Sequence, residues 1–233
     1  LYLLDTDTEE NTPEDRSTTH YLYGGDHENR LKQELILGIG GIRALTAMGI
    51  KPDLYHSNEG HSAFISLERL RILIAENHLT FNEALEIVRS STLFTTHTPV
   101  PAGHDAFEED LLRKYISHYH SRLSITWDEL MALGRCEGDI DRKFNMSFLA
   151  TRMSQELNGV SKLHGEVSQG MFNKLWPGYL KEELYIGSVT NGVHFPTWVA
   201  PEWEEVFDDI TGGPDFDQTD RSLWERLYTV DDR

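Results

Sequence analysis

Residues Leu93-Phe94-Thr95-Thr96-His97-Thr98-Pro99-Val100-Pro101 decide the fold class. The first four are apolar or β-branched, and they predict a short buried strand over Leu93–Thr96. The polar residues and two prolines that follow predict a stiff loop at the end of that strand. Upstream, residues Thr80–Arg89 show a helical pattern with Thr80 as the N-cap. Helix, strand and loop in this order are typical of a parallel sheet with flanking helices.

The same alternation extends in both directions along the chain. Apolar runs predict further strands at Leu1–Leu4, Asp53–His56 and Leu184–Val189. Helical spacing of apolar residues predicts helices over Asn29–Met48, over Ser62–Asn77, from Phe107, over Asn145–Phe172 and, in the tail, from Glu202 and around Ser222–Leu227. The predicted fold class is therefore α/β, with a Rossmann-like parallel sheet and flanking helices.

Composition limits the kinds of partner that the chain can have. The 233 residues carry a net charge of -18, which disfavours nucleic acid and anionic membranes as partners. No apolar run approaches the ~20 residues of a membrane helix, and the single cysteine, Cys136, cannot form an internal disulfide. These features predict a cytoplasmic protein. Because the chain starts at Leu1, without methionine, we expect it to be a piece of a longer protein.

A first polar cluster, His56-Ser57-Asn58-Glu59-Gly60-His61, leaves a predicted strand and enters a helix. Loops at the carboxyl ends of parallel strands are where open α/β sheets bind ligands. A zinc site is one alternative, although the two histidines are not spaced by one helical turn as in metalloproteases, and we predict no metal. Another alternative is that Ser57 or Asn58 only caps the helix.

Two further polar loops follow predicted strands. Thr95–Asp105 contains two prolines and Gly103, so that His97 at its root can hold an imidazole or a carbonyl at a fixed distance from a substrate. Thr190-Asn191-Gly192-Val193-His194 follows the strand predicted at Leu184–Val189. The glycine-rich run Gly38-Ile39-Gly40-Gly41 lies inside a helical pattern and predicts close helix packing, not a nucleotide loop.

Taken together, these segments resemble the α-glucan phosphorylase family, to which glycogen and maltodextrin phosphorylases belong. The resemblance covers nearly the whole chain and rests on five ordered motifs. They are Leu22-Tyr23-Gly24-Gly25-Asp26 with Arg30-Leu31-Lys32-Gln33-Glu34, the His56–His61 cluster, Thr96–Pro101, Asn158-Gly159-Val160-Ser161-Lys162-Leu163-His164-Gly165-Glu166, and Thr190–His194.

This resemblance implies transfer of a glucosyl unit from an α-1,4-glucan to inorganic phosphate, with release of glucose 1-phosphate. It implies that His97 and Asn191 are catalytic residues in contact with the transferred glucose. An oxocarbenium-like transition state requires such fixed polar contacts. The remaining substrate-binding residues implied are Asn58, Glu59, His61, Thr98 and His194.

The resemblance also implies the place of the chain in its parent. Residues 1–197 would form the later part of the first, glucan-side Rossmann-like domain of a two-domain GT-B type glycosyltransferase. Residues 198–233 would begin the second, cofactor-side domain. The family uses pyridoxal phosphate, and its lysine motif is not found in this sequence. We therefore expect no cofactor-binding residue here and an inactive isolated piece. A homo-oligomeric parent is compatible with the resemblance.

Two other functions compete with this interpretation. A glycogen synthase-like enzyme would use a nucleotide sugar and no pyridoxal phosphate, and the Thr-His-Thr-Pro loop is compatible with it. A non-catalytic glucan-binding module would bind sugar on exposed aromatic side chains, but the five tryptophans form no evident row. The Asn191 loop and the Lys32-Gln33-Glu34 segment favour the phosphorylase.

Overall fold

The computed structural model describes residues 1–22, 24–138, 141–213 and 216–230. Tyr23, which belongs to the first of the motifs quoted above, lies outside the described residues. The chain divides into two compact units, Leu1–Thr190 and Asn191–Arg233. Each unit is described by itself.

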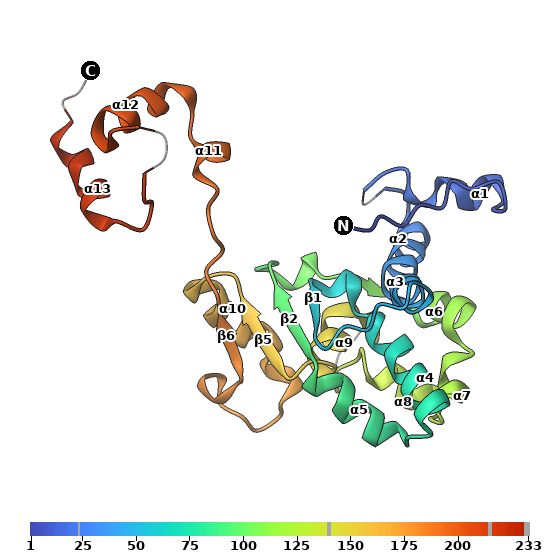
Figure 1. The fold of residues 1–233 in the computed structure, drawn as a ribbon. Coiled ribbons are helices and arrows are strands. Elements are labelled where there is room, and N and C mark those ends of the chain that lie inside the picture. The colour runs from blue at the N-terminus through green and yellow to red at the C-terminus, as the bar shows by residue number, and fades with distance from the viewer. Residues whose placement is uncertain (23, 139–140, 214–215, 231–233) are drawn as a thin grey trace. The chain divides into compact units, whose positions relative to one another are not determined.

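Four parallel strands form the sheet of the first unit (Figure 1). In spatial order they are β1 (Tyr55–Asn58), β2 (Thr92–Thr96), β5 (Glu156–Gly159) and β6 (Ile186–Ser188). The register aligns one residue of each strand across the sheet, namely Asn58, Thr95, Asn158 and Gly187. The predicted α/β class with a parallel sheet and flanking helices is confirmed, and so are the strands expected near Asp53–His56, Leu93–Thr96 and Leu184–Val189.

Helices connect the strands, as a parallel sheet requires. The helix predicted over Asn29–Met48 is present as α2 (His27–Leu35), a π-helical turn (Ile36–Gly40) and α3 (Gly41–Ala47). The other helices of this unit are α1 (Pro13–Arg16), α4 (Ile65–Asn77), α5 (Phe81–Ser90), α6 (Glu109–Ile116), α7 (Tyr119–Arg122), α8 (Trp127–Ala132), α9 (Met146–Arg152) and α10 (Lys162–Phe172). A small antiparallel pair, β3 (Ala106–Phe107) and β4 (Phe144–Asn145), lies beside them.

The single long helix predicted over Asn145–Phe172 is wrong. Strand β5 separates α9 from α10. The apolar residues of α9, β5 and α10 together show a three-to-four-residue spacing that is typical of one helix, because the strand between the two helices is only four residues long. Gly159 ends β5 where the chain turns into α10, and a Cβ there would lie 2.7 Å from the backbone nitrogen of Gly165. The glycine therefore permits a tight strand-to-helix turn.

The strand predicted at Leu1–Leu4 is also wrong, because these residues have no regular structure. Leu3 is 83% exposed. A strand is stable only when another strand or a packed face accompanies it, and within the described residues no strand pairs with Leu1–Leu4.

Helix α4 carries the chain away from β1 and into the core of the first unit. Phe64, Leu67 and Leu70 are fully buried, and they follow the one-face spacing expected from the sequence. Helix α5 begins with the predicted cap, since the Thr80 hydroxyl accepts the Glu83 backbone N–H and the Glu83 carboxylate accepts the Thr80 N–H. These contacts fix the helices that position the ends of β1 and β2.

Gly38 lets the α2–α3 helix pack closely against the start of α4. A Cβ at this position would lie 2.7 Å from the Phe64 Cβ and 2.9 Å from the Ile65 backbone nitrogen. We expect Gly38→Ala to lower the free energy of unfolding by about 1–3 kcal/mol through overpacking. Gly41→Ala is the control, because nothing lies within 4 Å of a Cβ there and alanine favours a helix. Equal urea midpoints for the two variants would contradict this account.

The second unit consists of α11 (Phe195–Trp198), α12 (Pro201–Thr211) and α13 (Arg221–Glu225). Its helices surround an aromatic cluster, in which the Phe195 ring lies 4.7 Å from Phe207 and 5.8 Å from Trp224. The two helices predicted for the tail are confirmed. In the part of the chain that the structure describes, no helix is long and apolar enough to cross a membrane.

Candidate active site

The loop after β1 has an unusual backbone at Glu59. Its φ is 65° and its ψ is 169°, a conformation that glycine adopts almost alone. Its N–H donates to the Thr95 carbonyl of β2 at 2.9 Å. The chain then makes a short 3-10 turn over Gly60–Ser62 before α4. Neither Ser57 nor Asn58 caps α4, because Ser57 bonds to Ser62 at 2.6 Å and the N-cap of α4 is Phe64.

Glu59 joins this loop to the one that follows β2. One oxygen of its carboxylate, Oε1, accepts the backbone N–H groups of His97 and, at 2.7 Å, of Thr98. The structure therefore brings the first and second polar clusters together at the carboxyl ends of β1 and β2, as predicted. The His97 side chain is exposed at this edge.

A polar cavity of about 550 Å³ lies beside these two loops. It brings together three of the predicted substrate-binding residues, Glu59, His61 and Thr98. Asn58 and His97 do not line this cavity, and Asn58 is exposed at the end of β1. The other residues of the lining are Gly25, Asp26, His27, Arg30, Gly60, Gly103, His104, Asp105 and Ser147.

His61 is half-buried in the wall of this cavity. Burial lowers the pKa of its imidazole, and the charge of Arg30 lowers it further against the opposing effect of Glu59. The imidazole is therefore neutral at pH 7 and can both donate and accept a hydrogen bond. Such a group suits contact with a sugar hydroxyl. Among the described residues no cluster could hold a metal ion.

Arg30 and Asp105 line the cavity, and we predicted no role for them from the sequence. Their side chains meet at 2.5 Å although they are 75 positions apart. His104 also lines the cavity, and its Nδ1 lies 2.7 Å from the Ser147 hydroxyl. Burial lowers the pKa of His104 as well. The signals in the sequence were the presence of Arg30 in one of the family-like motifs and of His104 and Asp105 in the loop Thr95–Asp105.

Glu34 lies beneath Arg30 and is 1% exposed. Burial raises its pKa to about 9, with a hydrogen bond and the charge of Asp105 adding to this effect. Arg30 is 3.3 Å from Glu34 but closer to Asp105, so its charge does not offset the burial. Glu34 is therefore a neutral acid at pH 7.

This raised pKa predicts a pH dependence of stability. The native state keeps a proton that the unfolded chain loses above its ordinary pKa of 4.5, so the contribution of Glu34 to stability is full below about 4.5 and falls as pH rises towards about 9. We expect Glu34→Gln to remove this fall. The unfolding free energy of the variant, relative to that of the wild type, should therefore rise by about 2–3 kcal/mol when the pH is raised from about 5.5 to about 7.5. Urea unfolding at both pH values measures the gain, and parallel profiles would contradict it.

A second polar network crosses the open face of the sheet. His56 Nε2 lies 2.7 Å from the Thr95 hydroxyl, which donates to Asn158 Oδ1 at 2.8 Å. A hollow of about 880 Å³ over this face is larger than the polar cavity, but the surface that lines it is mostly apolar. We place the candidate site at the smaller cavity, because titratable groups converge there.

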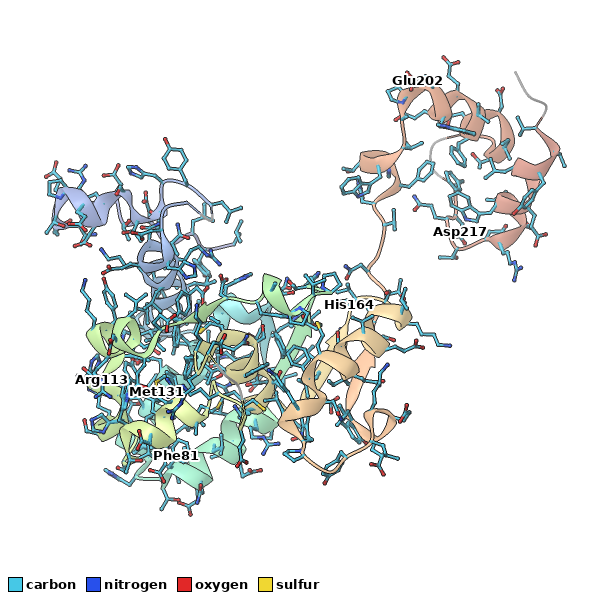
Figure 2. The ribbon with its side chains drawn as sticks, turned by 180° about the vertical axis from the view of Figure 1, so that it is seen from behind. Phe81, Arg113, Met131, His164, Glu202 and Asp217 are labelled. Carbon is cyan, nitrogen blue, oxygen red and sulfur yellow. The ribbon has the colours of Figure 1, made fainter. Side chains whose placement is uncertain are left out.

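His164 lies in the first turn of α10, at the carboxyl end of β5 (Figure 2). Its Nδ1 accepts the Val160 N–H at 3.2 Å, and its Nε2 is buried without a protein partner in the described residues. The imidazole thus holds the turn after Gly159, which accounts for a histidine in this motif.

Asn191 and His194 belong to the second unit and are exposed in it. His194 Nδ1 lies 2.7 Å from the Thr197 hydroxyl. The third polar loop does follow β6, the neighbour of β5 in the sheet. The approach of Asn191 and His194 to His97 stays a prediction.

Comparison with known proteins gives the family. Residues 51–213 match the family described as "Carbohydrate phosphorylase". The chain is 46% identical to a glycogen phosphorylase of Mycobacterium tuberculosis over 99% of its own length and 28% of that protein. It is 45% identical to a maltodextrin phosphorylase of Thermococcus litoralis, over 91% of the chain and 25% of that protein. It thus spans under a third of these curated relatives. The chain belongs to the carbohydrate phosphorylase family.

Proposed function

We propose that this chain is the central portion of an α-glucan phosphorylase. The whole protein would transfer a glucosyl unit from the end of an α-1,4-glucan, glycogen or maltodextrin, to inorganic phosphate and release glucose 1-phosphate. The observation that carries the proposal is the convergence of Glu59, His61 and the His97–Thr98 backbone at one sheet edge, in a chain of this family.

His97 and Asn191 are the proposed catalytic residues. The His97 carbonyl and imidazole would face the transferred glucose, where fixed dipoles stabilise positive charge that develops in the transition state. Asn191 would hydrogen-bond the same sugar. Asn58, His61, Thr98 and His194 would bind glucan hydroxyls around it, and the neutral imidazole of His61 suits that role.

The cofactor of the family, pyridoxal phosphate, does not fit the polar cavity. None of the described residues that line it is a lysine, and Asp26, Glu59 and Asp105 stand against a single guanidinium, that of Arg30. A phosphate dianion would be repelled by such a lining. We therefore assign the cofactor and its lysine to the rest of the parent protein, and expect the 233-residue chain alone to be inactive.

The domain assignment is part of the same proposal. Residues 1–197 would complete the first Rossmann-like domain of a GT-B enzyme, and residues 198–233 would begin the second. The division of the chain into compact units after Thr190 supports a boundary in this region. The lone cysteine, Cys136, is free, which supports a cytoplasmic location.

An assay of the full-length protein with maltooligosaccharide tests the proposal. Release of glucose 1-phosphate that requires inorganic phosphate is the expected result. Glucosyl transfer that requires a nucleotide sugar would replace the proposal with a synthase. Binding of glucan without any transfer would favour a non-catalytic module.

A further inference from the structure

Glu59 occupies a backbone conformation that costs a residue with a side chain about 1–3 kcal/mol. Its φ of 65° and ψ of 169° would suit glycine, and a glycine does follow at position 60. Because glutamate stands at the strained position, its side chain must supply contacts that offset the strain. Such outliers are found mainly at functional sites.

The contacts of the Glu59 carboxylate are directed at the protein backbone. Oε1 accepts two successive N–H groups, those of His97 and Thr98, and lies 3.4 Å from the Thr96 hydroxyl. Oε2 accepts the N–H of Gly60 at 3.3 Å. Paired backbone N–H groups of this kind form a small anion-binding nest, and hydrogen bonds to a carboxylate are about twice as strong as neutral ones.

These contacts leave Oε1 little capacity for a substrate hydroxyl. An ionised carboxylate oxygen accepts about two hydrogen bonds, and the His97 and Thr98 N–H groups already supply two to Oε1. Since the N–H of Glu59 also donates to Thr95, the residue bridges the carboxyl ends of β1 and β2 from both its backbone and its side chain. The bridge is centred on the peptide groups on either side of His97.

We propose that Glu59 is a positioning residue, whose carboxylate fixes the backbone of His97 and Thr98 at the end of β2. By this action it would orient the His97 carbonyl and imidazole, instead of binding the glucan as the family resemblance implies. The inference rests on the proposed function only for the role of His97. The hydrogen bonds from the His97 and Thr98 N–H groups to the Glu59 carboxylate form a backbone clamp. This clamp is a property of the fold and can be measured without any assay of catalysis.

Glu59→Gly and Glu59→Gln separate the two roles. Glycine removes the carboxylate without adding backbone strain, because it adopts positive φ freely. Glutamine keeps an oxygen that can accept the same N–H groups but removes the charge. Glu156→Ala is a matched control, since Glu156 is an exposed carboxylate at the amino end of β5.

Hydrogen exchange of the full-length protein, loaded with its cofactor, gives the first readout. We expect the amides of His97 and Thr98 to exchange about tenfold faster or more in Glu59→Gly, because a broken charge-assisted bond opens the loop locally. Exchange in Glu156→Ala is expected to match the wild type. Exchange in Glu59→Gln is expected to lie closer to the wild type than to Glu59→Gly, because the amide oxygen still accepts both N–H groups through weaker, neutral bonds. Unchanged exchange at His97 and Thr98 in Glu59→Gly would overturn the proposal.

Kinetics give the second readout. We expect Glu59→Gly to lower kcat for phosphorolysis about tenfold with a smaller change in KM for maltooligosaccharide, and Glu59→Gln to recover most of the loss. If Glu59→Gln loses as much as Glu59→Gly while its exchange is normal, the carboxylate acts on the sugar and the inference fails. If exchange changes as expected but neither the wild type nor any variant phosphorolyses glucan, the clamp is supported and the proposed function fails.

Discussion

The His97→Ala variant of the full-length protein is expected to form glucose 1-phosphate about 100-fold more slowly than the wild type, measured as kcat/KM. In the proposed site the imidazole would face the transferred glucose. Loss of one preorganised polar contact to a transition state typically costs about 10²–10³ in rate. The backbone clamp from Glu59 should survive, because it uses the His97 N–H and not the imidazole. The loss therefore reports on the side chain.

A histidine at the far end of α4 provides the control for this variant. His78 is the C-cap of α4, whose 13 residues place it about 20 Å from the helix start. It has a φ of 56°, so His78→Asn is preferable to alanine because asparagine tolerates this conformation. We expect full activity from His78→Asn. A His97→Ala variant that retains more than half of the wild-type kcat/KM would remove His97 from the catalytic machinery.

The Phe64→Ala variant is expected to lose about 3–5 kcal/mol of unfolding free energy, the range for large aromatic side chains in a core. Phe64 is fully buried, its ring stacks on that of Phe144 at 6.4 Å, and Gly38 packs directly against its Cβ. Phe144 belongs to β4 and Gly38 to the π-helical turn between α2 and α3. Because their backbones are held in these elements, they cannot move into the space that the ring leaves.

Urea unfolding measures the loss, with Ile87→Ala as the comparison. Ile87 lies on α5 and is 44% exposed, so its truncation is expected to cost under about 1 kcal/mol. Similar costs for the two variants would mean that Phe64 is not at the centre of the packing that holds the β1 loop in place. Because α4 starts directly after that loop, the Phe64 variant should also perturb the candidate site.

The elements that the sequence predicted correctly are those with a local cause. The strand over β2 follows from its β-branched and apolar residues, and the start of α5 follows from Thr80 as the N-cap. Both depend on residues a few positions apart. The alternation of predicted strands and helices along the chain then indicated a parallel sheet.

The errors have non-local causes. Strand β5 was hidden inside a helical pattern, because only its pairing with β2 and β6 distinguishes it from helix. The strand expected at Leu1–Leu4 has the right residues but, among the described residues, no strand to pair with. In both cases tertiary context overrides the local pattern.

The candidate site divides in the same way. The polar loops after β1 and β2 could be placed at one edge of the sheet, because both follow strands that were predicted to be parallel. The structure brings Glu59, His61 and Thr98 to one cavity there. The pair formed by Arg30 and Asp105 could not be predicted, since only the fold brings together residues 75 positions apart. Nor could the direction of the Glu59 side chain, which depends on its positive φ.

The most direct test of the central claim is a crystal structure of the full-length protein with glucose bound. The claim predicts one glucose in hydrogen-bond contact, within about 3.2 Å, with both His97 and Asn191, and His61 next to the same sugar site. A glucose bound away from the ends of β1 and β2, or His97 and Asn191 too far apart for one sugar to span, would contradict it.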